Sequence, residues 1–131
     1  MNELMPFAEK MLSKHREFHP FGGTMSVDGE IAYAAGYTGE EHPPAQELID
    51  TLEDGFRDGA KRHAYKATGI VVDVRTIPPG KKDKQDAVAV RLDHVSGYSV
   101  SVLFPYSFSQ SGDLAFEAPF ATPGDGRIFG R

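Results

Sequence analysis

Three segments in the second half of the chain alternate large apolar residues with small or polar ones. They are residues 65–77, 87–95 and 98–106, and a period of two over such lengths is typical of β-strands. The bulky side chains occupy the even-numbered positions: Ile70, Val72, Val74, Val88, Val90, Leu92, Tyr98, Val100, Val102, Phe104 and Tyr106. Because successive side chains of a strand point to opposite faces, we expect this even set to pack beneath helices. The odd set would then form a second face of small and lightly charged residues.

Two segments in the first half have helical spacing instead. Residues 4–18 place apolar side chains three or four positions apart and end before a proline. Residues 43–63 repeat this pattern behind two prolines, which the first turn of a helix accommodates, and basic residues gather at the end of the segment. Between the two helices, Asp28-Gly29 predicts a tight hairpin turn that leads into a strand over residues 31–37.

These elements follow the order α-β-β-α-β-β-β. They predict an α+β fold in a single domain, with a five-stranded antiparallel sheet and two helices on one face. Over residues 3–106 this order resembles that of the roadblock and profilin-like domains, and the resemblance implies five antiparallel strands that carry helices on one face. The stretches Pro20-Phe21-Gly22 and Asp28-Gly29-Glu30 are similar to those of small bacterial proteins. Neither resemblance implies a functional residue.

Residues 107–131 differ from the rest of the chain because they combine phenylalanines with glycines and prolines and show no period. A terminus with this composition is expected to be loose, yet its aromatic side chains need a surface to pack on. We therefore predict a core domain over residues 1–106 and an irregular aromatic tail over residues 107–131. The tail would dock on the core or on a partner chain.

Composition and charge narrow the possible functions. The chain has 131 residues, of which 40% are hydrophobic and 25% charged, and this suits one folded domain. The net charge of −5 disfavours nucleic-acid binding, because the dense basic cluster within residues 81–84 is interrupted by an aspartate. The lack of cysteine excludes thiolate metal sites and cysteine nucleophiles. No apolar run is long enough for a membrane helix and the N-terminus is no secretory signal, so we expect a cytoplasmic protein that binds neither nucleic acid nor membrane.

His15 and His19 stand four residues apart, the spacing at which two histidines on one helix can bind a metal ion. The pattern lacks a third ligand, and Pro20 pushes His19 out of helical geometry. We therefore expect a helix that ends near a half-buried His15, and we expect neither a metal site nor a cofactor. A second polar run before the next helix is interpreted as capping and solvation: Glu40, Glu41 and His42.

Four charged residues are expected on the odd face of the sheet. Asp73, Arg75, Arg91 and Asp93 stand there among alanine, glycine and serine, and Asp73 could oppose Arg91 across neighbouring strands. This face could be a solvated charge ladder, or it could be covered by the tail or by a partner, because small residues permit a close approach. A catalytic role for Asp73 or Asp93 has the least support, since no nucleophile or phosphate-binding loop accompanies them.

Two interpretations of function follow from the sequence. In the first, the protein is a small bacterial-type, non-enzymatic protein-interaction module that forms a homodimer or binds a protein partner in an immunity-like or adaptor-like role. In the second, it is a small-molecule-binding domain or a small enzyme, with a pocket between the tail, the 40–44 loop and the sheet. The sequence favours the first, and no catalytic residue is assigned. The candidate binding residues are Asp73, Arg75, Arg91, Asp93, His15 and His42.

Overall fold

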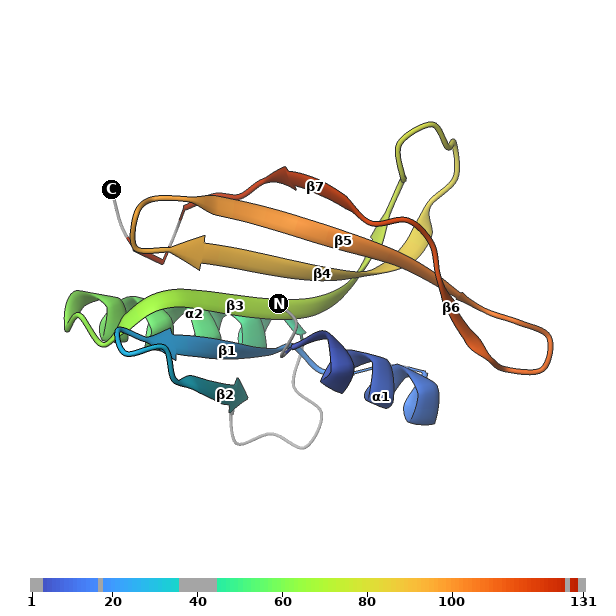
Figure 1. The fold of residues 1–131 in the computed structure, drawn as a ribbon. Coiled ribbons are helices and arrows are strands. Elements are labelled where there is room, and N and C mark those ends of the chain that lie inside the picture. The colour runs from blue at the N-terminus through green and yellow to red at the C-terminus, as the bar shows by residue number, and fades with distance from the viewer. Residues whose placement is uncertain (1–3, 17, 36–44, 127, 130–131) are drawn as a thin grey trace.

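The computed structural model describes residues 4–16, 18–35, 45–126 and 128–129 of the chain (Figure 1). Within these ranges there are two helices, α1 (Met5–His15) and α2 (Ala45–Lys61), and seven strands. The strands are β1 (Phe21–Ser26), β2 (Ile31–Ala35), β3 (Tyr65–Thr76), β4 (Gln85–His94), β5 (Ser99–Phe108), β6 (Leu114–Phe116) and β7 (Phe120–Pro123). The α+β class with two helices and an antiparallel sheet is confirmed, and the first seven elements follow the predicted order.

The sheet has more strands than the predicted five. Its order is β2-β1-β3-β4-β5-β6, and β7 also pairs with β5. β6 pairs with the last residues of β5 and β7 pairs with its first residues, so that both lie along the same edge of that strand. The prediction of a five-stranded sheet is therefore wrong, because the glycine- and proline-containing tail contributes two short strands.

The two helices lie on opposite faces of the sheet, which corrects the prediction that both lie on one face. Leu12 of α1 belongs to a core cluster with Val71 and Val88, whereas Phe56 of α2 belongs to a second cluster with Val72. In Figure 1, α2 runs behind the sheet and α1 lies at one end of it. We call the two sides of the sheet the α1 face and the α2 face.

The register between β3 and β4 explains this arrangement. Val71 pairs with Val90, so odd positions of β3 share a face with even positions of β4. In the next pair Val90 lies opposite Val102, and even positions of both strands share a face. Val72 and Val90 are both buried, as the alternation predicted, but they lie beneath different helices.

The end of the α1 face that carries α1 is closed by the hairpin of β5 and β6. Phe108, Leu114 and Phe116 pack against the cluster that contains α1. The guanidinium carbon of Arg16 lies 4.9 Å from the centre of the Phe108 ring, a distance suited to a cation–π contact. This half of the face is therefore a continuous core.

Both helices end close to the predicted places. α1 ends at His15, three residues before the predicted end, because Arg16 adopts a left-handed conformation with φ of 61° and donates its backbone N–H to the Leu12 carbonyl. The predicted proline start of α2 lies outside the described residues. Neither helix, as far as the structure describes the chain, is long and apolar enough to cross a membrane.

Candidate functional site

The four charged residues predicted for one face are divided between two. Asp73 lies opposite Val88, and Arg91 lies opposite Ile70, so Asp73 and Arg91 are not cross-strand partners. By this register Asp73 and Arg75 belong to the α1 face, while Arg91 and Asp93 belong to the α2 face. The expectation that all four residues share one face, with Asp73 opposite Arg91, is therefore wrong for the same reason that the helix placement was wrong.

Asp73 and Arg75 lie at the closed end of the α1 face, where their contacts are structural. The hydroxyl of the buried Tyr106 donates a hydrogen bond of 2.7 Å to Oδ1 of Asp73. Burial and the neighbouring carboxylate raise the pKa of Tyr106 well above its ordinary value, so this tyrosine remains a donor. Arg75 pairs at 3.5 Å with Asp86 on the neighbouring strand, and both side chains are largely exposed.

The histidines do not form the helical pair that metal binding would need. His15 is the last residue of α1 and is exposed, and His19 lies beyond the helix. The expectation of a half-buried His15 is therefore wrong. No group of three or more histidine or acidic side chains could hold a metal ion among the residues that the structure describes. His42, together with Glu40 and Glu41, lies outside those residues.

Arg91 and Asp93 line a polar cavity of about 370 Å³ on the α2 face. Its floor is formed by β4 and β5, one wall by α2 and the other by the tail after β7. Besides the two charged residues, its lining includes Glu53, Ser99, Ser101, Gly124, Asp125 and Gly126. The sheet and the tail thus meet at a polar site whose floor carries Arg91 and Asp93. The 40–44 loop, which the predicted pocket included, lies outside the described residues.

The cavity changes the pKa of the Asp93 carboxyl group. Burial raises the pKa of the Asp93 carboxyl, and the nearby Asp125 carboxylate raises it further. A hydrogen bond from the Ser99 side chain opposes this change and favours the charged form. The carboxylate is therefore partly desolvated, and a cationic group in the cavity would stabilise it.

Glu53 is a lining residue that the sequence analysis missed. It is 7% exposed on the sheet-facing side of α2, among Ile49, Leu52 and Phe56. An acid four residues after Ile49 and three before Phe56 falls within the apolar stripe of the helix, and this position was the available signal. This signal was not used in the sequence analysis.

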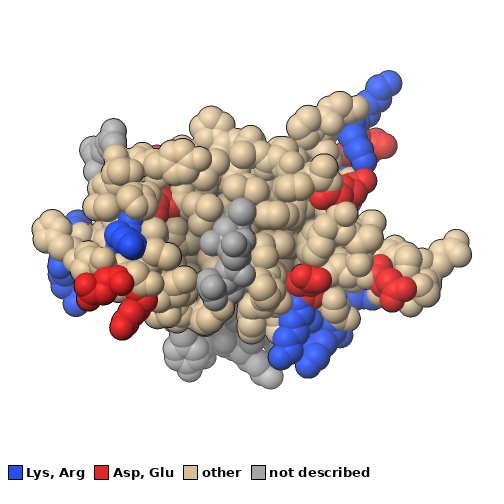
Figure 2. Space-filling model, in the orientation of Figure 1, with Lys and Arg blue, Asp and Glu red and all other residues tan. Residues whose placement is uncertain are grey.

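The other half of the α1 face, toward the β1–β2 and β4–β5 turns, has neither of the two described helices over it. We call it the open face and define it by the residues that the register brings to this side: Met25, Ile31, Tyr33, Ala67, Leu92, Val100 and Val102. Ile31 is 41% exposed and Tyr33 60%. In Figure 2, the Lys, Arg, Asp and Glu side chains of the described residues gather toward the two ends of this side of the molecule.

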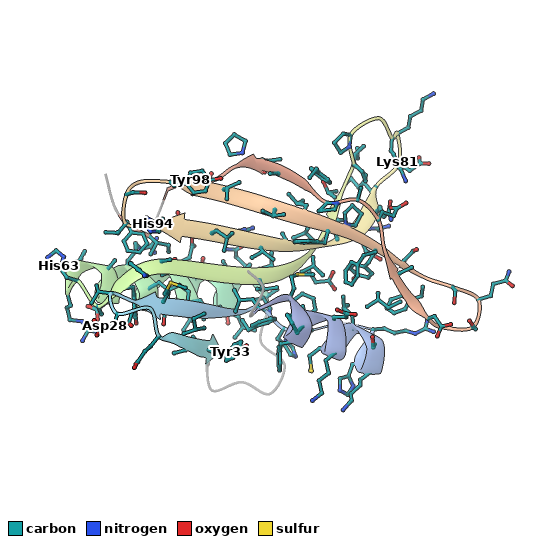
Figure 3. All side chains as sticks on the ribbon, viewed as in Figure 1. Asp28, Tyr33, His63, Lys81, His94 and Tyr98 are labelled. Carbon is teal, nitrogen blue, oxygen red and sulfur yellow. The ribbon has the colours of Figure 1, made fainter. Side chains whose placement is uncertain are left out.

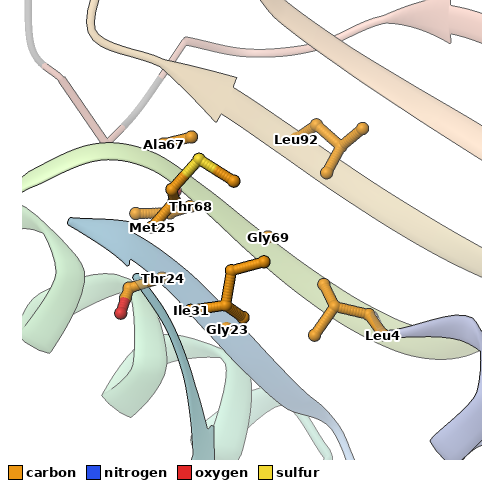
Figure 4. Close-up of a pocket in the computed structure, with 9 residues that line it drawn as sticks. All are labelled: Leu4, Gly23, Thr24, Met25, Ile31, Ala67, Thr68, Gly69 and Leu92. Carbon is orange, nitrogen blue, oxygen red and sulfur yellow. The ribbon is translucent and has the colours of Figure 1, made fainter. Parts of the chain in front are cut away.

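A small apolar hollow of about 70 Å³ lies where the open face meets the start of α1 (Figure 4). Leu4, Met25, Ile31 and Leu92 provide its larger lining side chains, and Gly23 and Gly69 form part of its floor. An added Cβ at either glycine would come within 2.8 Å of Leu4, so the lack of a side chain at these two positions lets Leu4 approach the sheet. The hollow could receive an apolar group from a partner.

No family model matches this chain, and neither a curated protein nor a solved structure is significantly similar to it.

Proposed function

We propose that the protein is a protein-interaction module that binds a second copy of itself through the open face. The observation that supports this proposal is a group of apolar side chains on one side of the sheet, on the half that neither described helix covers. Large contiguous apolar surfaces on a folded chain mark sites of association.

The exposed surface of the chain is large for its mass. The chain exposes 8123 Å². A compact monomer of 14.3 kDa is expected to expose about 6,800 Å². The excess of about 1,300 Å² is more than the roughly 800 Å² that each partner buries in a standard protein–protein interface. The chain therefore has enough surplus surface for a dimer.

The chemistry of the open face favours a second copy over a charged partner. No Asp, Glu, Lys or Arg is among its defining residues, and His94, which the register also brings to this side opposite Ala67, lies at its edge. The open face therefore offers little fixed charge for a basic or acidic partner to complement. In a two-fold dimer the same patch meets itself, and an uncharged apolar patch is self-complementary. The charged side chains at the two ends of this side of the molecule would lie at the rim of the dimer interface. There they stay in water, and like charges of the two acidic chains need not come into contact. An immunity-like or adaptor-like role would instead leave the protein monomeric until another protein occupies this face.

A matched pair of isoleucines tests the proposal. Ile31 lies on the open face and is 41% exposed, while Ile77 is 51% exposed. Ile77 lies in the β3–β4 loop, which also carries Lys81 and lies far from the turn that carries Asp28 (Figure 3). Ile31→Asp would place a carboxylate in the dimer interface and weaken the dimer by a factor of at least about thirty, whereas Ile77→Asp should leave it unchanged.

The measurement is sedimentation equilibrium over a wide range of protein concentration. The proposal predicts a mass of about twice 14.3 kDa for the wild-type chain and for Ile77→Asp at high concentration, and a shift toward monomer for Ile31→Asp. A wild-type chain that stays monomeric at about 1 mM, where even a weak dimer forms, would contradict the proposal. Equal dissociation of the two variants would contradict the choice of face.

A further inference from the structure

The cavity on the α2 face brings a guanidinium and a carboxylate, those of Arg91 and Asp93, to one side of a single strand. Arg91 and Asp93 are two positions apart on β4 and therefore project to the same side, about 7 Å apart along the strand. Ser101 and Ser99 lie directly opposite them on β5. The floor of the cavity thus consists of a guanidinium, a carboxylate and two hydroxyl groups.

The two charges do not neutralise each other. Over the described part of the chain, Arg91 makes no hydrogen bond or ion pair, and Asp93 has the Ser99 side chain as its hydrogen-bond partner. Both side chains are half-buried. A half-buried guanidinium and a half-buried carboxylate that face one cavity at a fixed spacing are two complementary subsites, one for an anionic group and one for a cationic group.

We propose that this cavity binds a small zwitterion of the amino-acid type, whose carboxylate pairs with Arg91 and whose ammonium group pairs with Asp93. A guanidinium presents two parallel donors to a carboxylate, while an ammonium group donates to a carboxylate at short range. A simple anion would pair with Arg91 alone and a simple cation with Asp93 alone, so neither would use both subsites. The Ser101 hydroxyl can bind a further polar group of the ligand, whereas the Ser99 hydroxyl already donates to Asp93 and accepts the Gly126 N–H.

The size of the cavity limits the ligand to a small molecule. Its volume of about 370 Å³ is near the lower end of the ~300–1,000 Å³ found for ligand pockets. The site lies on the opposite side of the sheet from the open face, so ligand binding and self-association are separate properties and are tested separately.

The test is a titration followed by amide chemical shifts in NMR, with L-serine as the zwitterion. Acetate and ethylamine are the comparison probes, because they carry the two charges of the amino acid on separate molecules. We expect saturable shifts for L-serine, centred on residues 91–101 and 123–126, with an affinity at least tenfold above that of either half probe. Arg91→Gln and Asp93→Asn should each weaken binding by at least about tenfold.

Two matched variants serve as controls. Arg75→Gln and Asp83→Asn make the same changes of side chain outside the cavity and should leave the L-serine affinity unchanged. The spectrum of each variant also reports whether it is folded. The proposal is overturned if L-serine causes no saturable shift at about 50 mM, if acetate alone binds as tightly, or if the cavity variants and the control variants bind equally.

Discussion

The two faces of this sheet are covered to different extents. On the α2 face, a helix of 17 residues and the end of the tail, with Ile128 3% exposed, cover the strands. On the α1 face, a helix of 11 residues and the β5–β6 hairpin cover one half and leave the other open. The covered face retains a polar cavity, whereas the open face is apolar.

This difference indicates two different ways to bind. A cavity between a sheet, a helix and a tail surrounds a small molecule and fixes its charges. A broad uncharged sheet surface has no such enclosure and is suited to another protein surface of similar shape. The comparison of the two faces therefore predicts where mutations will affect stability and where they will affect association.

The largest expected effect comes from removing one large side chain beneath each helix. Leu12 is 0% exposed and Phe56 is 4% exposed. Leu12→Ala should lower the free energy of unfolding by about 2–5 kcal/mol and Phe56→Ala by about 3–5 kcal/mol, because each leaves a cavity in a packed cluster. Urea denaturation measures both. A cost below about 1 kcal/mol for Leu12→Ala would show that α1 is not docked on its face as the structure has it.

A smaller loss of stability is expected from valine-to-alanine substitutions on the α1 face, and its size should differ between the closed and the open half. Val88 is 0% exposed at the closed end, and Val100 is half-buried on the open face. Val88→Ala should cost about 2 kcal/mol, and Val100→Ala about 0.5–1 kcal/mol in dilute solution, because part of the Val100 side chain already contacts water. The same denaturation experiment compares them at a low protein concentration. Equal costs would mean that the open half is as well covered as the closed half.

The smallest effect concerns Asp93 in the cavity of the α2 face. Because the folded state raises the pKa of this carboxyl above its ordinary 3.8, Asp93 binds its proton more tightly when folded. Its contribution to stability is therefore fully present below pH 3.8 and is lost as the pH rises through the raised pKa. Asp93→Asn should raise the melting temperature at pH 7, and this gain should vanish at low pH.

Thermal unfolding of the wild type and the variant between pH 3 and pH 7 measures this difference. Asp83→Asn, which makes the same substitution in an exposed loop, is the control and should show no such trend. A gain for Asp93→Asn that is independent of pH would contradict the desolvation of Asp93.

The sequence was sufficient to predict the two helices and the strands β3, β4 and β5, because strong periodicity marked each of them. Alternation within β3, β4 and β5 also predicted which side chains of each strand share a face. It could not predict how the faces of neighbouring strands match, since this depends on whether Thr76 pairs with Gln85 or with a residue beside it. A shift of one residue in that register exchanges the two faces of every later strand.

The same register explains how far the site could be predicted. Arg91 and Asp93 were correctly treated as neighbours on one face, because they belong to one strand. Asp73 and Arg75 were wrongly added to them, because they belong to the strand across the uncertain connection. The strands β6 and β7 were missed because short strands among glycines and prolines show no period, and their pairing depends on the exposed edge of β5.

The most direct test of the open face compares methyl groups on the two sides of the sheet. Relaxation enhancement by a soluble paramagnetic probe is measured for Leu92 and Val100 on the open face and for Val72 and Ile49 on the α2 face, in dilute and in concentrated protein. We expect the open-face methyls to be accessible to the probe when dilute and protected when concentrated, and the other two to be protected in both samples. Open-face methyls that are protected in dilute protein, or that stay accessible in concentrated protein, would contradict this account.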